Sequence, residues 1–209
     1  MMTPAPPDGD SPSLLPLIPD VSDGDGPVRP VKAVSGQPCC CCGTRAQRLW
    51  LAREAHGQIC TLCWLTQNLD SQTAAHGLLA WLPDAARADM QNLQRYALIA
   101  LHSQDRAIRR EGKRVWNWLV RHAREVEGMW GTSRASEFAG AMRALTPARR
   151  RELQQRLEGC VLILPPDVFA EDLTLLLPAG RRVETALHTP AWQTYYRSTL
   201  YAKSPDPLD

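Results

Sequence analysis

Two cysteine pairs are the residues of this 209-residue chain whose spacing most directly implies chemistry. Cys39 with Cys42, and Cys60 with Cys63, each have the Cys-x-x-Cys spacing. A turn of this kind directs two sulfur atoms to one point, and two such turns supply the four thiolates of a tetrahedral zinc site, with Zn–S distances of about 2.3 Å. Gly43 supplies the unhindered backbone that such a tight turn needs. The spacing therefore predicts one zinc ion per chain, bound by these four cysteines.

The chemistry expected of this site is structural. Four thiolates leave no coordination position for water, which a catalytic zinc ion requires. The first residues show neither the basic region nor the apolar run of a secretory signal, so we expect a cytoplasmic protein whose thiols stay reduced. The alternative is a set of free thiols or a transient disulfide. Cys40 and Cys41 are intervening residues of the first pair, and Cys160 is expected to be a small buried residue.

Metal-dependent nuclease activity is an alternative, because HNH-type nucleases can also carry two such pairs. Their chemistry needs a His that activates water and further His or Asn ligands for a divalent ion. His56 is the only His between the pairs, and no His or Asp neighbours it. The sequence shows no Ser/His/Asp grouping, phosphate-binding Gly loop or close carboxylate pair. We therefore predict that the protein is not an enzyme.

The segments around the pairs indicate how the cysteines are positioned. Residues 49–59 have the length of a small hairpin, and residues 64–69 follow the second pair without Pro or Gly. The second pair is therefore expected at a helix N-terminus. A cysteine knuckle, a hairpin and a helix that carries ligands together describe a treble-clef zinc module, which we assign to residues 38–76.

A helical body with short strands is predicted for residues 77–200. Residues 77–83 and 159–165 share one plan, a Gly, five mostly apolar residues and a Pro, which is typical of buried strands. Asp84 is expected to cap the next helix. The other predicted elements are a helix from 105 to 127 ended by Gly128, a helix from Pro147 to Leu157, a strand at 173–177, and a last helix that begins at Thr189 and Pro190 and contains Trp192. The fold class is α+β, mostly helical.

The predicted helix 105–127 is amphipathic and basic. Its expected buried stripe is Ile108, Val115, Trp116, Leu119, Ala123 and Val126. The rest of its surface carries Arg106, Arg109, Arg110, Lys113, Arg114, Arg121 and Arg124. This face is either simply solvated or binds an acidic protein segment; nucleic acid is the less favoured partner.

The N-terminal residues differ in composition from the rest. Residues 1–38 hold nine of the seventeen prolines, and residues 1–28 contain five Asp but no Lys or Arg. A segment of this composition buries too little apolar surface to offset the conformational entropy that it would lose on folding. Residues 1–37 are therefore predicted to be a disordered leader. Residues 38–209 are predicted to form one folded domain. No apolar run approaches the roughly 18 residues of a membrane span, so direct membrane insertion is not expected.

Taken in order, these motifs resemble the DotN (IcmJ) family of type IVB secretion and conjugation systems. The resemblance rests on Cys39-x-x-Cys42-Gly43, Cys60-x-x-Cys63, the 77–83 strand followed by Asp84, the second strand that ends at Leu164-Pro165, and Trp192 in the last helix. It implies an HNH-like treble-clef fold without nuclease activity. It also implies zinc ligation by the four paired cysteines.

The resemblance further implies the role of a noncatalytic adaptor. Members bind the C-terminal tail of the DotL-type coupling ATPase, act together with other coupling-complex subunits, and help recruit substrates to the channel at the cytosolic face of the inner membrane. This is our main hypothesis. The alternative is a zinc-dependent nucleic-acid-binding protein that uses the basic face of residues 106–124.

Overall fold

The computed structural model describes residues 14–22, 31–32, 37–52 and 57–187. In these ranges about half of the chain is helical and two small antiparallel sheets are present, which agrees with the predicted α+β class. The first sheet has the order β1 (Val31–Lys32), β2 (Arg48–Leu51), β3 (Gln58–Cys60). The second pairs β4 (Leu78–Trp81) with β5 (Cys160–Ile163).

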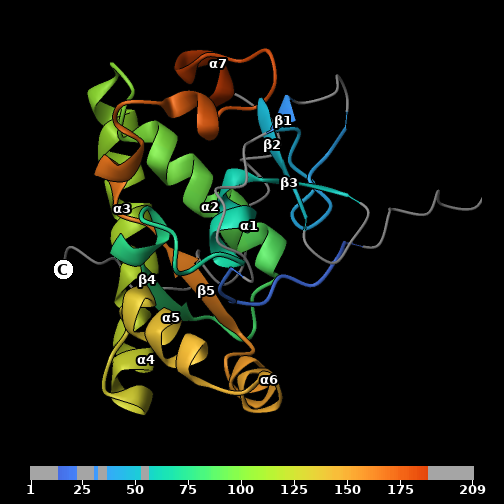
Figure 1. Ribbon diagram of the computed structural model, residues 1–209. Helices are drawn as coiled ribbons and strands as arrows, with labels where there is room; N and C mark the ends of the chain where they lie inside the picture. The colour runs from blue at the N-terminus through green and yellow to red at the C-terminus, as the bar shows by residue number, and fades with distance from the viewer. Residues whose placement is uncertain (1–13, 23–30, 33–36, 53–56, 188–209) are drawn as a thin grey trace, which may run out of the picture.

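The β4–β5 ribbon lies in the interior, between the cysteine-rich region and the long helices (Figure 1). Both strands fall within the predicted runs, and they pair with each other in a register that places Leu79 opposite Leu162. Those two leucines face the core of the cysteine-rich region, whereas Val161 and Ile163 face the core of the long helices. Because both faces of the ribbon are buried, the strands are apolar throughout and do not alternate with polar residues.

Four helices build the side of the molecule that packs on this ribbon. They are α2 (Arg87–Ala100), α3 (Arg106–Arg121), α4 (Ala123–Trp130) and α5 (Ala135–Ala144). The prediction that Asp84 caps α2 is wrong, because the N-cap residue is Ala86. Asp105 does cap α3: its Oδ1 accepts hydrogen bonds from the backbone N–H of Ala107 at 2.7 Å and of Ile108 at 3.4 Å.

The predicted helix 105–127 is two helices, which meet at His122. The backbone carbonyl of His122 accepts a hydrogen bond from Trp81 N in β4 at 3.2 Å, so a tertiary contact holds the chain at the junction. Gly128 does not end α4, which continues to Trp130. The predicted stripe is buried at Val115, Leu119, Ala123 and Val126 and half-buried at Ile108 and Trp116. Trp118, outside the stripe, is also buried.

Helices α2 and α3 pack closely because Gly112 lies at their contact. A Cβ atom at this position would lie 2.7 Å from the Ala100 Cβ and 3.1 Å from the Ala97 carbonyl oxygen. Real Cβ atoms essentially never approach another atom within 3.0 Å, so the contact with Ala100 requires glycine.

Shorter elements complete the described chain. They are α1 (Thr61–Thr66), α6 (Pro147–Arg156), α7 (Val183–Leu187) and three 3₁₀ turns at Ala74–His76, Pro166–Phe169 and Leu173–Leu175. Helix α6 confirms the start predicted from Thr146 and Pro147. The predicted strand at 173–177 is wrong, because Asp172 accepts a hydrogen bond from Thr174 N and caps a 3₁₀ turn there. The predicted last helix from Thr189 lies outside the described residues.

Residues 14–22 pack against the folded body, which corrects the prediction of a disordered leader for this part of residues 1–37. Leu17 and Val21 are buried in the core of the cysteine-rich region. Asp20 N donates to the Thr66 carbonyl at 3.0 Å, and Leu69 N donates to the Asp20 carbonyl at 2.8 Å. Composition averaged over a long window hides a short stretch that contains apolar residues.

No helix within the described ranges is both long enough and apolar enough to cross a lipid bilayer.

Candidate metal centre

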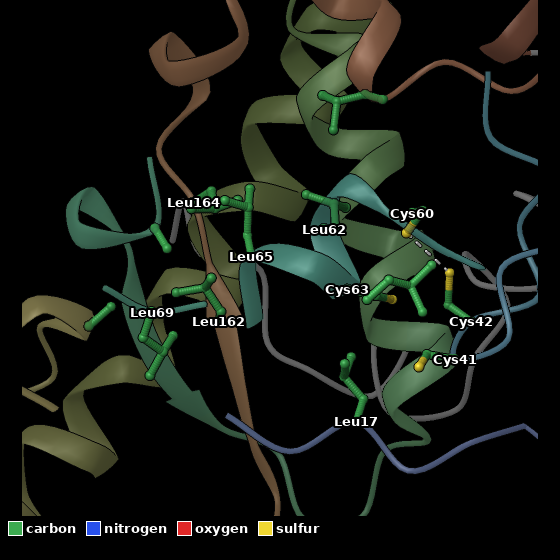
Figure 2. Packing of buried hydrophobic residues seen from close by; sticks show 14 of the residues in the cluster. Leu17, Cys41, Cys42, Cys60, Leu62, Cys63, Leu65, Leu69, Leu162 and Leu164 are labelled. Carbon is green, nitrogen blue, oxygen red and sulfur yellow. Dashed lines mark hydrogen bonds between the residues drawn. The ribbon is translucent and has the colours of Figure 1, made fainter. Parts of the chain in front are cut away.

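The four cysteines of the two pairs come together in one buried cluster. The sulfur atoms of Cys39, Cys42, Cys60 and Cys63 all lie within 4.8 Å of one another, and Cys42 Sγ is 3.6 Å from Cys60 Sγ. Figure 2 shows Cys42, Cys60 and Cys63 gathered at the N-terminal end of α1. Tetrahedral bonds of about 2.3 Å place ligand sulfurs about 3.8 Å apart. The cluster therefore has the size and donor atoms to hold one metal ion.

The first pair lies in a tight turn held by two backbone hydrogen bonds. Gly43 N donates to the Cys39 carbonyl, and Cys39 N donates to the Thr44 carbonyl, each at 2.8 Å. Gly43 has a φ of 72°, a left-handed conformation that residues with a Cβ rarely adopt, as the sequence argument required. Both sulfurs of the turn thus point to the same side, toward the second pair.

The second pair lies where a strand becomes a helix. Cys60 ends β3 and is the N-cap residue of α1, and Cys63 is in the first turn of that helix. Strands β2 and β3 pair antiparallel with Leu49 opposite Cys60, so the predicted hairpin and the predicted position at a helix N-terminus are confirmed. His56, between the two pairs, lies outside the described residues.

Aromatic packing fixes α1 against the hairpin. The rings of Trp50 in β2 and Trp64 in α1 stack with centroids 4.2 Å apart. Trp50 Nε1 also donates a hydrogen bond to Thr61 Oγ1 at 3.2 Å. These contacts hold Cys60 and Cys63 in a fixed relation to β2.

Arg95 of α2 reaches the cluster, and the sequence argument did not find it. Its side chain is fully buried, with the residue 1% exposed, and Nη2 lies 2.9 Å from Cys60 Sγ and 3.7 Å from Cys42 Sγ. Its Nη1 donates to Thr44 Oγ1 at 2.8 Å and also to Asn92 Oδ1. Helix α2 also buries the polar side chains of Gln91, Asn92 and Gln94, and hydrophobic periodicity gives no signal for buried polar residues of this kind.

Asn92 ties the same helix to the cysteine turn. Its Nδ2 donates to the Cys42 carbonyl at 3.1 Å, and its Oδ1 accepts from Thr44 Oγ1 as well as from Arg95. The first cysteine pair is therefore attached to α2 through its backbone and through its sulfur.

The sulfur atoms and the guanidinium perturb one another. Burial raises the pKa of the Cys60 thiol, and a hydrogen bond with Cys39 raises that of Cys63. Hydrogen bonds from Cys39 and Cys60, together with the charge of Arg95, lower the pKa of Cys42. Burial by itself would lower the pKa of Arg95, but the neighbouring sulfurs of Cys60 and Cys42 outweigh it and raise that pKa. Four thiolates can exist together here only with positive charge among them.

The remaining cysteines differ in their relation to the cluster. Cys41 is buried beside it, and hydrogen bonds with Cys39 and Cys63 lower the pKa of Cys41 to about 5. Cys40 is only half-buried. Cys160 is buried in β5, where burial raises its pKa to about 11; this confirms the prediction of a buried residue.

The basic face of α3 is partly engaged in local contacts. Arg109 Nη1 donates to the Ser103 and Gln104 carbonyls at 2.6 and 2.8 Å, and Arg114 pairs with Glu111 at 3.1 Å. The exposed cations of the predicted face are Arg106, Arg110, Lys113 and Arg124.

No family model matches the chain, and no curated protein matches it.

Proposed function

We propose that this protein is a noncatalytic, zinc-containing adaptor subunit of a type IVB secretion or conjugation coupling complex, in which it binds a DotL-type coupling ATPase. The observation that carries the proposal is the closed, buried cluster of Cys39, Cys42, Cys60 and Cys63. These four cysteines are the residues that the resemblance to the DotN (IcmJ) family implies as zinc ligands. The order of knuckle, hairpin and ligand-bearing helix supports an HNH-like treble clef.

The donor set favours zinc, held for structure. Thiolates select zinc, copper(I) or iron, and four sulfurs in a tetrahedral arrangement are typical of zinc. A cluster of several irons would hold its ligands farther apart than the 4.8 Å limit observed here. When bound, the ion would cross-link the cysteine turn to α1 and contribute its binding energy to folding. With four sulfur ligands it would offer no position for a substrate.

Exposed cations on two helices suit a role in binding other proteins. On helix α6, Leu153 packs against the core and the Arg156 guanidinium lies over the Trp130 ring, whereas Arg149 and Arg151 are exposed. The exposed cations of α3 and α6 would complement an acidic segment of a partner.

The test is affinity capture of the tagged full-length protein from cells that carry the whole transfer locus, with elemental analysis of the purified chain. We expect one zinc per chain and a coupling ATPase in the eluate. R149E/R151E in α6 and R110E/K113E in α3 are matched charge reversals, and loss of the ATPase with one pair would locate the surface. An eluate that repeatedly lacks the ATPase would refute the adaptor role.

Nucleic-acid binding is the competing outcome of the same experiment. Its support is the set of exposed cations on α3, which phosphates could contact. In that case DNA or RNA would bind with an affinity that falls log-linearly with salt concentration, and R110E/K113E would reduce the slope. Cleavage of DNA with added Mg²⁺ or Mn²⁺ would instead indicate a nuclease.

A further inference from the structure

A fully buried arginine next to the cysteine cluster is the feature of the structure that zinc ligation by itself leaves unexplained. The guanidinium of Arg95 contacts cysteine sulfur and the neutral oxygens of Thr44 and Asn92. Its Nε has no hydrogen-bond partner among the described residues. No described carboxylate is among its hydrogen-bond or ion-pair partners.

Burying such a cation without an anion is costly. An uncompensated charge in a protein interior is strongly destabilising, and natural proteins pair such charges. A divalent ion with four thiolates carries a formal charge of −2, which is equally costly in a dry interior. The two buried charges are therefore complementary, and Arg95 Nη2, 2.9 Å from Cys60 Sγ, is within hydrogen-bonding distance of that sulfur.

We propose that Arg95 is the buried counter-cation of the metal–thiolate centre, and that through it the metal ion is energetically coupled to helix α2. Its charge offsets half of the excess negative charge of the centre, and its N–H groups orient the Cys60 and Cys42 sulfurs. Arg95 is thus a positioning residue. The inference rests on the zinc occupancy in the proposed function.

The geometry supports coupling to α2 in particular. Asn92 lies one turn before Arg95 and donates a hydrogen bond to the Cys42 carbonyl, while Arg95 contacts Cys42 Sγ. Helix α2 also contributes Leu98 and Ile99 to the core that contains the cysteines. A change at the metal centre should therefore affect α2, the helix that packs on α3.

The experiment compares zinc affinity, by competition with a chromophoric chelator, among the full-length wild type, R95M, R95K and R95Q. Loss of an outer-shell hydrogen-bond partner typically lowers metal affinity 10- to 100-fold. We expect this loss in R95M, which has similar volume but no charge, a similar loss in R95Q, and an affinity nearer wild type in R95K. The control is Q94M, which removes the buried hydrogen bonds of Gln94 to Leu162 and Leu164 in the same helix without touching sulfur.

A spectroscopic readout separates charge compensation from general destabilisation. With Co²⁺ in place of zinc, the thiolate-to-metal charge-transfer band reports the energy of the sulfur lone pairs. Removing a nearby cation raises that energy, so the band should move to longer wavelength in R95M and R95Q, less so in R95K, and not in Q94M. A purely structural role would lower affinity in R95M and Q94M alike and leave the band in place.

The outcomes distinguish this inference from the proposed function. A wild-type chain that binds no zinc defeats the proposed function. A wild-type chain that binds zinc, with R95M unchanged in affinity and in its cobalt spectrum, overturns only the role of Arg95. If R95M does not fold, R95Q and R95K decide by the same two readouts. The inference requires that R95Q loses zinc affinity and shifts the cobalt band, and that R95K keeps the wild-type affinity and band position. The reverse result, with R95K changed and R95Q unchanged, contradicts the inference.

Discussion

Cys60 has three roles at one position: it ends strand β3, precedes the first turn of α1 and contributes a sulfur to the buried cluster. Serine has nearly the same shape but is a poor ligand for a thiolate-selective metal. C60S should therefore lose the metal ion and, because coordination energy is folding energy in such sites, most of the soluble folded protein. Elemental analysis together with circular dichroism would measure both effects.

Cys40 provides the matched control for this substitution. It lies in the turn of the first cysteine pair, between Cys39 and Cys42, is only half-buried and does not belong to the four-sulfur cluster. C40S should retain one metal ion per chain and a wild-type spectrum. Folded C60S without metal, or loss of metal in C40S, would contradict the assignment of the ligands.

At the scale of elements, the contact of α2 with α3 depends on Gly112. In G112A the new methyl group would meet the Ala100 Cβ at 2.7 Å, and overpacking of this kind costs about 1–3 kcal/mol. The gain in helix propensity is about 1 kcal/mol and offsets only part of that cost. We expect a lower urea midpoint in G112A.

Gly128 in α4 offers the opposite case. A Cβ there would have no neighbour within 4 Å, so G128A should raise the free energy of unfolding by up to about 1 kcal/mol. If both substitutions stabilised the protein, the close packing of α2 on α3 would be wrong.

Residues 14–22 contact the carboxylate of Asp70 through Ser22, and we expect this contact to depend on pH. Burial alone would raise the pKa of Asp70, but hydrogen bonds from Ser22 and from Arg143 outweigh it and lower that pKa. A lowered pKa in the folded state gives stability that is complete above the unfolded value of about 3.9 and is lost as pH falls through the folded value.

D70N should accordingly cost about 1–2 kcal/mol at pH 7 and progressively less below pH 4 or so, measured by urea denaturation across pH. D84N is the control, because Asp84 is exposed and does not cap α2; we expect a change within about 0.5 kcal/mol. An equal effect of D70N at all pH values would show that Asp70 acts through shape and not through charge.

At the scale of the whole molecule, the cysteine-rich region and the helical body share one core. The apolar cluster that contains the four cysteines also contains Leu79 of β4, Leu98 of α2 and Phe138 of α5. Figure 2 shows Leu62 and Leu65 of α1 on the side of Leu162 and Leu164. The predicted modules 38–76 and 77–200 should therefore lose stability together.

Chelation of the metal should lower the thermal midpoint of the helical signal, and unfolding should remain a single transition. Far-ultraviolet circular dichroism would report the helices and tryptophan fluorescence would report the Trp50–Trp64 stack beside the cluster. Two separate transitions, with the helical one unaffected by the chelator, would mean that the two regions fold independently.

The sequence by itself determined the features set by short-range spacing and by chain breakers. Two Cys-x-x-Cys pairs are local motifs, so the four cysteines could be assigned before any contact was known, and they do converge. Strands β4 and β5 and helix α6 are bounded by Gly and Pro, whose backbone restrictions act within a few residues. The predicted start of a helix at residue 105 agrees with α3, for which Asp105 is the N-cap residue.

Only the tertiary structure decided which distant segments meet. The pairing of β4 with β5, the break at His122 under a hydrogen bond from β4, and the burial of Leu17 and Val21 all depend on partners far away in the chain. Arg95 is the clearest case. In the sequence it is one of 24 basic residues, and only the fold buries it and places the sulfurs of Cys60 and Cys42 beside it.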